Sequence, residues 1–168
     1  IDKFDFKTCV DYGCAKGFLV HALRILGCDA YGEDISEYAI ENCHPAVKKY
    51  VSHPNNKVYD LLICKDVLEH IDEVNIPDVL EKFLRKSNQF FFTIPLGDND
   101  RFRIREYEVD VTHVTKKDEE WWINMFERNG FKLKEFRYNL GSIKEKWMPE
   151  HPYGNGFFIL ESVNDNTR

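Results

Sequence analysis

The sequence predicts an α/β protein with a mostly parallel sheet of about seven strands, an antiparallel last strand and helices on both faces. Two observations carry this prediction. Short apolar runs alternate with helical segments, and residues 9–17 place small residues at a strand-to-helix crossover. At 168 residues and 43% hydrophobic content, the chain can bury one sizeable core. We therefore expect residues 1–168 to form a single domain.

The first crossover joins an expected strand at Thr8–Tyr12 to an expected helix at Phe18–Leu26. Its loop holds Gly13, Ala15 and Gly17, and such small residues let the backbone wrap closely around a charged small molecule. Open α/β sheets bind ligands at this edge. A dinucleotide fingerprint needs a small residue at its sixth position, where the bulky first residue of the helix stands, so the spacing disfavours a pyrophosphate. A tight turn without a ligand is the alternative for this loop alone.

A second strand is expected over residues 30–33, and Ser36 is expected to cap a helix that runs through Ile40. Asp34 lies about as far after the glycine loop as a ribose-binding carboxylate is expected. Such a carboxylate can accept hydrogen bonds from both ribose hydroxyls. Its neighbour Glu33 is the competing acid, but alternation along the strand points Glu33 to the other side.

The later elements follow from local patterns. Between residues 41 and 59, His-Pro pairs break the pattern, so only a short strand near Tyr50 and Val51 is expected there. Gln89–Ile94 is the next buried strand, and residues 95–114 form a long connection of the kind that is usually functional or mobile. A helix opens at Asp118 with acids in its first turn and stops at Asn129-Gly130. Residues 131–139 and 157–163 are the expected last two strands.

Three segments in order resemble the class I S-adenosylmethionine-dependent methyltransferases. The pattern Asp11-x-Gly13-x-Ala15-x-Gly17 is similar to the first motif of that family, with Ala15 in place of the middle glycine. Asp34 stands where the family has the acid after its second strand, and Tyr59–Ile71 is similar to the fourth motif. The resemblance implies a Rossmann-like fold and S-adenosylmethionine as cofactor. The residues that it assigns to the cofactor are Asp11, Gly13, Ala15, Gly17, Asp34, Ile35, Lys65, Asp66 and Val67.

The C-terminal half points to the methyl acceptor. Residues 110–114, followed by Trp121-Trp122 and residues 129–131, resemble a segment of many small-molecule methyltransferases. Methyl transfer to a small molecule, preferably at oxygen, is therefore the expected activity. His113, on the loop after the fifth strand, is the first candidate for a general base, and Asp110 orients it or plays the same part. A histidine that only pins the loop is the alternative.

A metal site is a further hypothesis. If a helix begins at Asp66, then Asp66, Glu69 and His70 share one face, and His113 comes from the loop above. Two carboxylates and two imidazoles suit Mg²⁺ or Mn²⁺. This arrangement resembles that of metal-dependent ubiquinone-pathway and small-RNA methyltransferases. The favoured expectation is that no metal binds, and that Glu69 and His70 only structure the start of the helix.

Composition limits the partners. The net charge of −6 and the short basic clusters disfavour nucleic acid. Arg101–Arg105 is expected to be a solvated loop paired with nearby acids, with an anionic substrate as the alternative. No apolar run approaches membrane-spanning length, and five cysteines without zinc-like spacing indicate reduced thiols, so a cytoplasmic protein is expected.

The start of the chain affects how the site closes. Few residues precede the first strand, whereas relatives commonly carry helices there that cover the cofactor. A partner domain, a dimer mate or the 95–114 connection is expected to close the site instead. The alternatives to a small-molecule enzyme are an RNA or protein methyltransferase and a cofactor-binding domain without catalysis.

Overall fold

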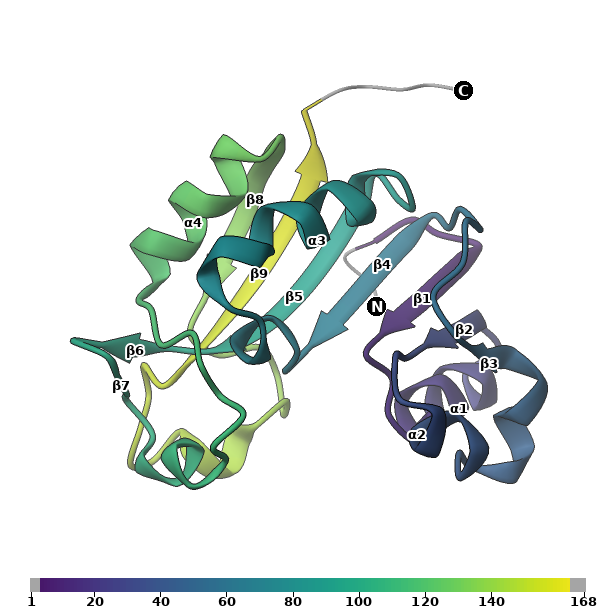
Figure 1. The fold of residues 1–168 in the computed structure, drawn as a ribbon, viewed down its shortest axis with the longest axis horizontal. Helices are drawn as coiled ribbons and strands as arrows, with labels where there is room; N and C mark the ends of the chain where they lie inside the picture. Colours follow the sequence, from purple (N-terminus) through teal and green to yellow (C-terminus); the bar gives the residue numbers. More distant parts are fainter. Residues whose placement is uncertain (1–3, 164–168) are drawn as a thin grey trace.

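The computed structural model describes residues 4–163, which form a seven-stranded sheet in the order β3-β2-β1-β4-β5-β9-β8 (Figure 1). The first five strands in this order are paired in parallel, and β9 runs antiparallel to both of its neighbours. The predicted Rossmann-like sheet with an antiparallel last strand is confirmed. Its strands are β1 (Thr8–Tyr12), β2 (Asp29–Glu33), β3 (Val51–Ser52), β4 (Leu61–Lys65), β5 (Gln89–Pro95), β8 (Phe131–Arg137) and β9 (Asn155–Ser162).

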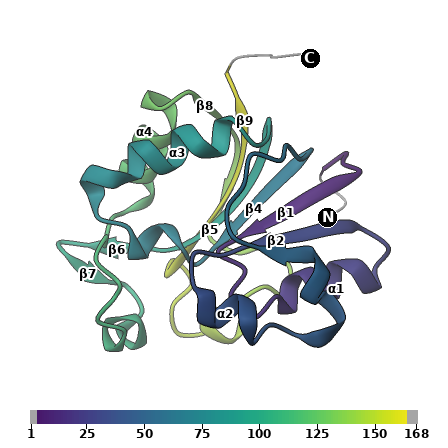
Figure 2. The same cartoon turned by 45° about the vertical axis from the view of Figure 1, so that its right-hand side comes forward.

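Helices cover both faces of the sheet. They are α1 (Phe18–Ile25), α2 (Glu37–Glu41), α3 (Ile76–Leu84) and α4 (Glu119–Arg128). Short 3₁₀ turns are η1 (Pro45–Tyr50), η2 (Leu68–His70), η3 (Glu73–Asn75), η4 (Arg105–Val109) and η5 (Glu145–Trp147). Figure 2 shows α3 and α4 on one side of the sheet and α1 on the other.

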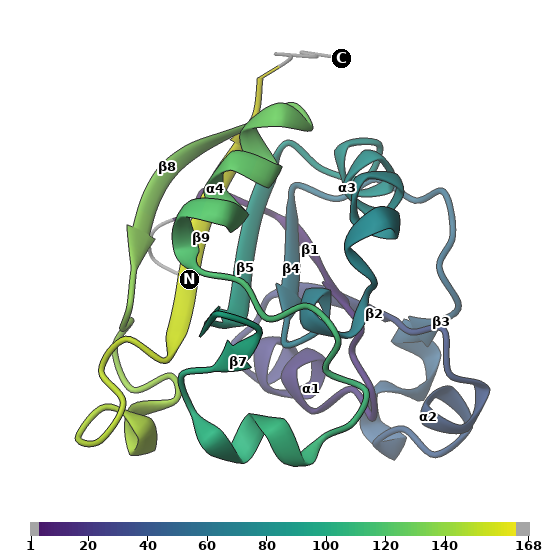
Figure 3. The same cartoon turned by 60° about the vertical axis from the view of Figure 1, so that its left-hand side comes forward.

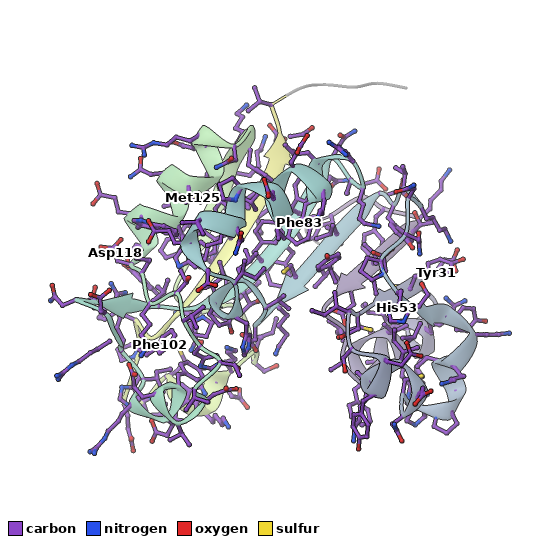
Figure 4. All side chains as sticks on the ribbon, viewed as in Figure 1. Tyr31, His53, Phe83, Phe102, Asp118 and Met125 are labelled. Carbon is purple, nitrogen blue, oxygen red and sulfur yellow. The ribbon has the colours of Figure 1, made fainter. Side chains whose placement is uncertain are left out.

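Alternation along the strands divides the core into two layers. Val10 and Leu62 belong to the layer that contains the buried side chains of α3 and α4, whereas Cys9 and Ile63 belong to the layer that contains those of α1. In the first layer Phe83 of α3 is fully buried. Figure 4 places Phe83 and the α4 residue Met125 over the same face. This packing fixes the strand ends from which the candidate site is built.

Caps fix the helix starts as the sequence predicts. Ser36 accepts a hydrogen bond from the amide of Ala39, and Asp118 accepts one from the amide of Trp121. Trp122 is fully buried in the core, and Trp121 packs against its edge. All five cysteines carry free thiols. Within residues 4–163, no helix has both the length and the apolar character to span a bilayer.

The connection after β5 is more ordered than an open loop. It contains a small hairpin of β6 (Gly97–Asp98) and β7 (Arg101–Phe102), followed by η4. Asn99 and Asp100 adopt left-handed φ angles of 50° and 61°, which residues of this kind tolerate in tight turns. Arg103 pairs with Asp98, as expected of a solvated loop, and also with Glu119. The guanidinium is therefore held by protein acids.

Candidate active site

The glycine loop packs tightly between the ends of β2 and β4. The Gly13 amide donates to the carbonyl of Glu33 at 2.7 Å, and Gly13 has a φ of 77°. A Cβ at this position would lie 2.3 Å from Cγ2 of Val67. Ala15, in place of the middle glycine, also takes a left-handed φ, of 46°. The loop therefore needs glycine at position 13 for both conformation and space.

Asp34 is the acid that faces this loop. One carboxylate oxygen accepts from the Ala15 amide at 2.7 Å, and the other accepts from the Ser36 amide at 2.8 Å. Glu33 points to the opposite side, as predicted, and its fully buried carboxylate pairs with Lys86 at 2.8 Å. Ile35 beside Asp34 leaves 80% of its surface exposed. An acid and an apolar side chain thus stand together at the rim of the loop.

Asp11 lies beneath the loop at the end of β1, with only 5% of its surface exposed. The pKa of its carboxyl is raised to about 7, chiefly by burial; the charge of Lys65 opposes this rise, and the charge of Asp34 contributes to it. A cationic ligand above the loop would favour the ionised form of this acid.

The chain after β4 departs from the prediction at Asp66. Asp66 has a left-handed φ of 56°, and the following turn is the 3₁₀ segment η2, so no helix begins at Asp66 and this condition of the metal hypothesis is not met. Its carboxylate is held by Lys65 at 2.5 Å and by Lys144 at 2.5 Å. Both lysines occupy the Asp66 carboxylate, and the ligand atoms that lie together are those of Glu69, His70 and His113, without Asp66.

Two histidines lie together at the end of η2, one from η2 itself and one from the connection after η4. The rings of His70 and His113 are 4.5 Å apart between centroids. Nδ1 of His113 lies 2.7 Å from the carbonyl oxygen of Tyr107, which can only accept, so Nδ1 carries the proton and Nε2 has a lone pair in the neutral ring. Asp110 is 3.8 Å from Nε2, so the Tyr107 carbonyl, rather than Asp110, orients the ring. Nδ1 of His70 contacts the hydroxyl of Thr112 at 2.8 Å.

Glu69 is fully buried next to these rings. Neither of its carboxyl oxygens has a hydrogen-bond partner among residues 4–163, while its backbone carbonyl accepts from the amides of Val114 and Thr115. Burial first, and then the charge of Asp66, raises the pKa of Glu69 to about 8. One ligand atom from each of Glu69, His70 and His113 lies within 4.8 Å of the others. Opposite ligands of a divalent cation are about 4.2 Å apart, so these three groups fit such an ion after a small contraction.

The raised pKa of Glu69 predicts a pH-dependent stability. An acid whose pKa is higher in the folded state stabilises the fold fully below its ordinary value of 4.5 and loses that contribution as the pH rises through about 8. We expect Glu69→Gln to raise the free energy of unfolding at pH 8.5 by roughly 2 to 4 kcal/mol, and by little at pH 4.5. Urea unfolding at both pH values measures this. Glu120→Gln, at an exposed position of α4, is the control. Equal changes in the free energy of unfolding at both pH values would contradict the raised pKa of Glu69.

Sequence reasoning missed three residues of the site. Lys144, Tyr107 and Asn155 converge on the Asp66 side of it, and Lys144 reaches Asp66 across 78 positions of sequence. They carry no local motif, since two of them lie in or next to the long β8–β9 connection and the third in η4. Only the tertiary fold brings them together.

Two hollows adjoin these groups. A cavity of about 540 Å³ is lined by Tyr12, Ile35, Asn56 and the end of α3. A second, mostly apolar cavity of about 290 Å³ lies against β4 and β5, where it is lined by Lys65 and Thr93 and bounded by Leu140 and Ile143. The first is next to the glycine loop and Asp34. The second begins at the end of β4.

A family model described as a methyltransferase domain matches residues 2–135, and the chain belongs to this family. It is an S-adenosylmethionine-dependent methyltransferase domain with the fold and strand order described above. No protein of curated function matches the sequence.

Solved structures agree on the fold. The chain is similar to the mitomycin 7-O-methyltransferase MmcR, with 14% identity, a TM-score of 0.71 and coverage of 95% of this chain, and it spans half of the length of that protein. Magnesium protoporphyrin IX methyltransferase from Synechocystis, solved with bound SAH, gives 17% identity, a TM-score of 0.68 and coverage of 94% of this chain and 74% of that one. The small RNA methyltransferase HEN1 gives 16% identity and a TM-score of 0.70, with coverage of 99% of this chain and 24% of that one.

Proposed function

We propose that this domain transfers the methyl group of S-adenosylmethionine to an oxygen atom of a small-molecule acceptor, with His113 as general base. The observation that carries the proposal is the hydrogen bond from His113 Nδ1 to the Tyr107 carbonyl, which leaves Nε2 able to take a proton. The similarity to a mitomycin 7-O-methyltransferase and to a magnesium protoporphyrin methyltransferase supports a small-molecule acceptor.

The cofactor is proposed to lie over the glycine loop. Asp34 binds the ribose, because each carboxylate oxygen keeps a lone pair beyond those that bind Ala15 and Ser36. The exposed Ile35 packs on the adenine beside the 540 Å³ cavity, and Asp11 faces the cationic methionine portion. Small residues in the loop, Gly13, Ala15 and Gly17, let the backbone approach the cofactor closely. The residues on the opposite side of the cofactor are Lys65, Asp66 and Val67.

The chemistry asks mainly for alignment. The acceptor oxygen attacks the methyl carbon, the carbon–sulfur bond breaks, and its electron pair goes to sulfur to give neutral S-adenosylhomocysteine. As the new oxygen–carbon bond forms, the hydroxyl proton passes to Nε2 of His113. Holding oxygen, carbon and sulfur in line supplies much of the rate.

Asp34 is the sharpest test of the cofactor assignment. We expect Asp34→Ala to weaken the binding of S-adenosylhomocysteine by roughly 1.5 to 3 kcal/mol for each charge-assisted hydrogen bond lost. Isothermal calorimetry measures this, with Glu41→Ala at the other end of α2 as the control. Unchanged affinity of the Asp34 variant, or NAD binding of similar strength in the parent, would overturn the assignment.

The activity itself is tested with S-adenosylmethionine labelled on the methyl group and a panel of phenols, hydroxylated heterocycles, carboxylic acids and amines. We expect label to appear in an oxygen-bearing acceptor together with S-adenosylhomocysteine. Transfer confined to amines would refute the oxygen preference. Tight cofactor binding without transfer to any small acceptor or RNA would favour a binding domain.

The Glu69–His70–His113 cluster favours one second candidate, a metal-dependent methyltransferase of the RNA 2′-O type. HEN1, a small RNA methyltransferase, is among the similar structures. Glu69, His70 and His113 would hold a divalent cation, and its charge would acidify the acceptor hydroxyl. Activity that requires Mg²⁺ or Mn²⁺ and is lost with EDTA would establish this candidate, and the base role of His113 would then move elsewhere. Calorimetry with Mn²⁺ on the parent and on Glu69→Gln tests binding directly.

A further inference from the structure

The connection between β8 and β9, residues 138–154, lies at the carboxyl edge of the sheet beside η4 (Figure 3). Most of its residues are exposed, but the side chain of Lys144 is only 12% exposed. Lys144 has a left-handed φ of 56°. A non-glycine residue keeps this costly conformation only where its surroundings hold it, so the contacts of Lys144 must stabilise it.

The ammonium group of Lys144 uses its three donors on three different segments. Nζ donates to Asp66 at 2.5 Å, to Asn155 at 2.9 Å and to the Tyr107 hydroxyl at 3.1 Å. Asp66 follows β4, Tyr107 lies in η4 and Asn155 begins β9. An ammonium has no fourth donor, so Lys144 keeps none for a ligand. Its part is to hold the protein together at this point.

The same contacts lead to the proposed base. The Tyr107 hydroxyl accepts a hydrogen bond from Lys144 and donates one to Asn155 at 2.9 Å. The backbone carbonyl of Tyr107 accepts the hydrogen bond from Nδ1 of His113. The rings of Tyr107 and His113 are 6.0 Å apart between centroids. One residue therefore links the β8–β9 connection to the histidine proposed as the base.

The connection also walls the apolar cavity. Leu140 and Ile143, shortly before Lys144, line it together with residues of α1, β4 and β5. Thr93 also lines it and is 1% exposed, and its hydroxyl has no hydrogen-bond partner among the described residues. Moving residues 140–144 would therefore open this cavity beside the end of β4.

We propose that Lys144 is a positioning residue, which latches residues 139–147 over the 290 Å³ cavity beside the end of β4, the proposed acceptor side, and, through Tyr107, sets the orientation of His113. The proposal rests on the proposed function of His113 as base. It makes the latched segment the acceptor-side cover of this domain. Lys144 acts through its neighbours and does not touch the reacting atoms.

The test compares Lys144→Met and Lys144→Arg with Lys146→Met, an exposed lysine on the same turn. Hydrogen exchange is followed by mass spectrometry on the S-adenosylhomocysteine complexes. In Lys144→Met we expect residues 139–147 and 105–113 to exchange at least about tenfold faster, with cofactor affinity unchanged. Lys144→Arg should recover part of the protection, and Lys146→Met should match the parent.

Kinetics supply the second readout. With an acceptor found in the panel, we expect Lys144→Met to lower kcat by about 10- to 100-fold with KM for S-adenosylmethionine unchanged, and arginine to restore part of it. If Lys144→Met does not fold, Tyr107→Phe removes one latch contact and should give a smaller change of the same kind. Exchange and turnover of Lys144→Met equal to those of Lys146→Met would overturn the latch. Parent turnover in His113→Ala would instead overturn the proposed base and leave the exchange result to judge the latch.

Discussion

Gly13→Ala is expected to weaken the binding of S-adenosylhomocysteine by about 2 to 3 kcal/mol, or roughly 30- to 150-fold in affinity. The new methyl group would lie 2.3 Å from Val67, and the residue would have to keep a φ of 77°. Relief of the overlap requires movement of the loop or of the segment after β4, and both belong to the proposed cofactor site. Calorimetry gives the affinity, and thermal unfolding gives the stability of the same variant.

Gly27→Ala is the matched control for this change. Gly27 also has a positive φ, of 85°, but no atom of residues 4–163 lies within 4 Å of its added Cβ. It should lose stability by the backbone cost alone, about 1 kcal/mol, and keep the cofactor affinity of the parent. Equal cofactor affinities in the two variants would show that the Gly13 contact does not shape the cofactor site.

His113→Ala is expected to lower kcat by about 10²- to 10⁴-fold, the range of a positioned general base. Cofactor affinity should change little, because the contacts of His113 are to Tyr107, His70 and Asp110 rather than to the glycine loop. Lower kcat at nearly constant KM for S-adenosylmethionine is the pattern of a group that acts in the transition state.

His151→Ala is the control for this histidine, since His151 lies on the β8–β9 connection and contacts Trp147 rather than the cluster. The rate should be measured across pH, because loss of the base removes the acidic limb of the profile. A His113 variant with parent turnover, with and without Mg²⁺, would reduce His113 to a structural role.

The sequence was sufficient where the evidence is local. The strand at Thr8–Tyr12 agrees residue for residue with β1, and the opposite orientations of Asp34 and Glu33 follow from simple alternation. Both depend on neighbours within a few positions along the chain. The cap at Ser36 and the start of a helix at Asp118 were predictable for the same reason.

The prediction failed where distant residues decide the conformation. Asp66 departs from the helical pattern with a left-handed φ, and its carboxylate pairs with Lys144, far along the chain. The same partner shows why the acceptor side carries no readable motif: Lys144, Tyr107 and Asn155 meet only in the folded protein. The hairpin after β5 had a turn signal in Asn99-Asp100 that the long-loop interpretation passed over.

The most direct test of the account is an amide NMR titration of the protein with S-adenosylhomocysteine. The account predicts one saturable site, with the largest shifts at Gly13, Ala15, Asp34, Ile35 and Val67. The amide signal of Gly27, which has a positive φ but follows the far end of α1, should not shift. Saturable shifts confined to other residues, or no saturable shift at all, would contradict the claim that this loop and Asp34 form the cofactor site.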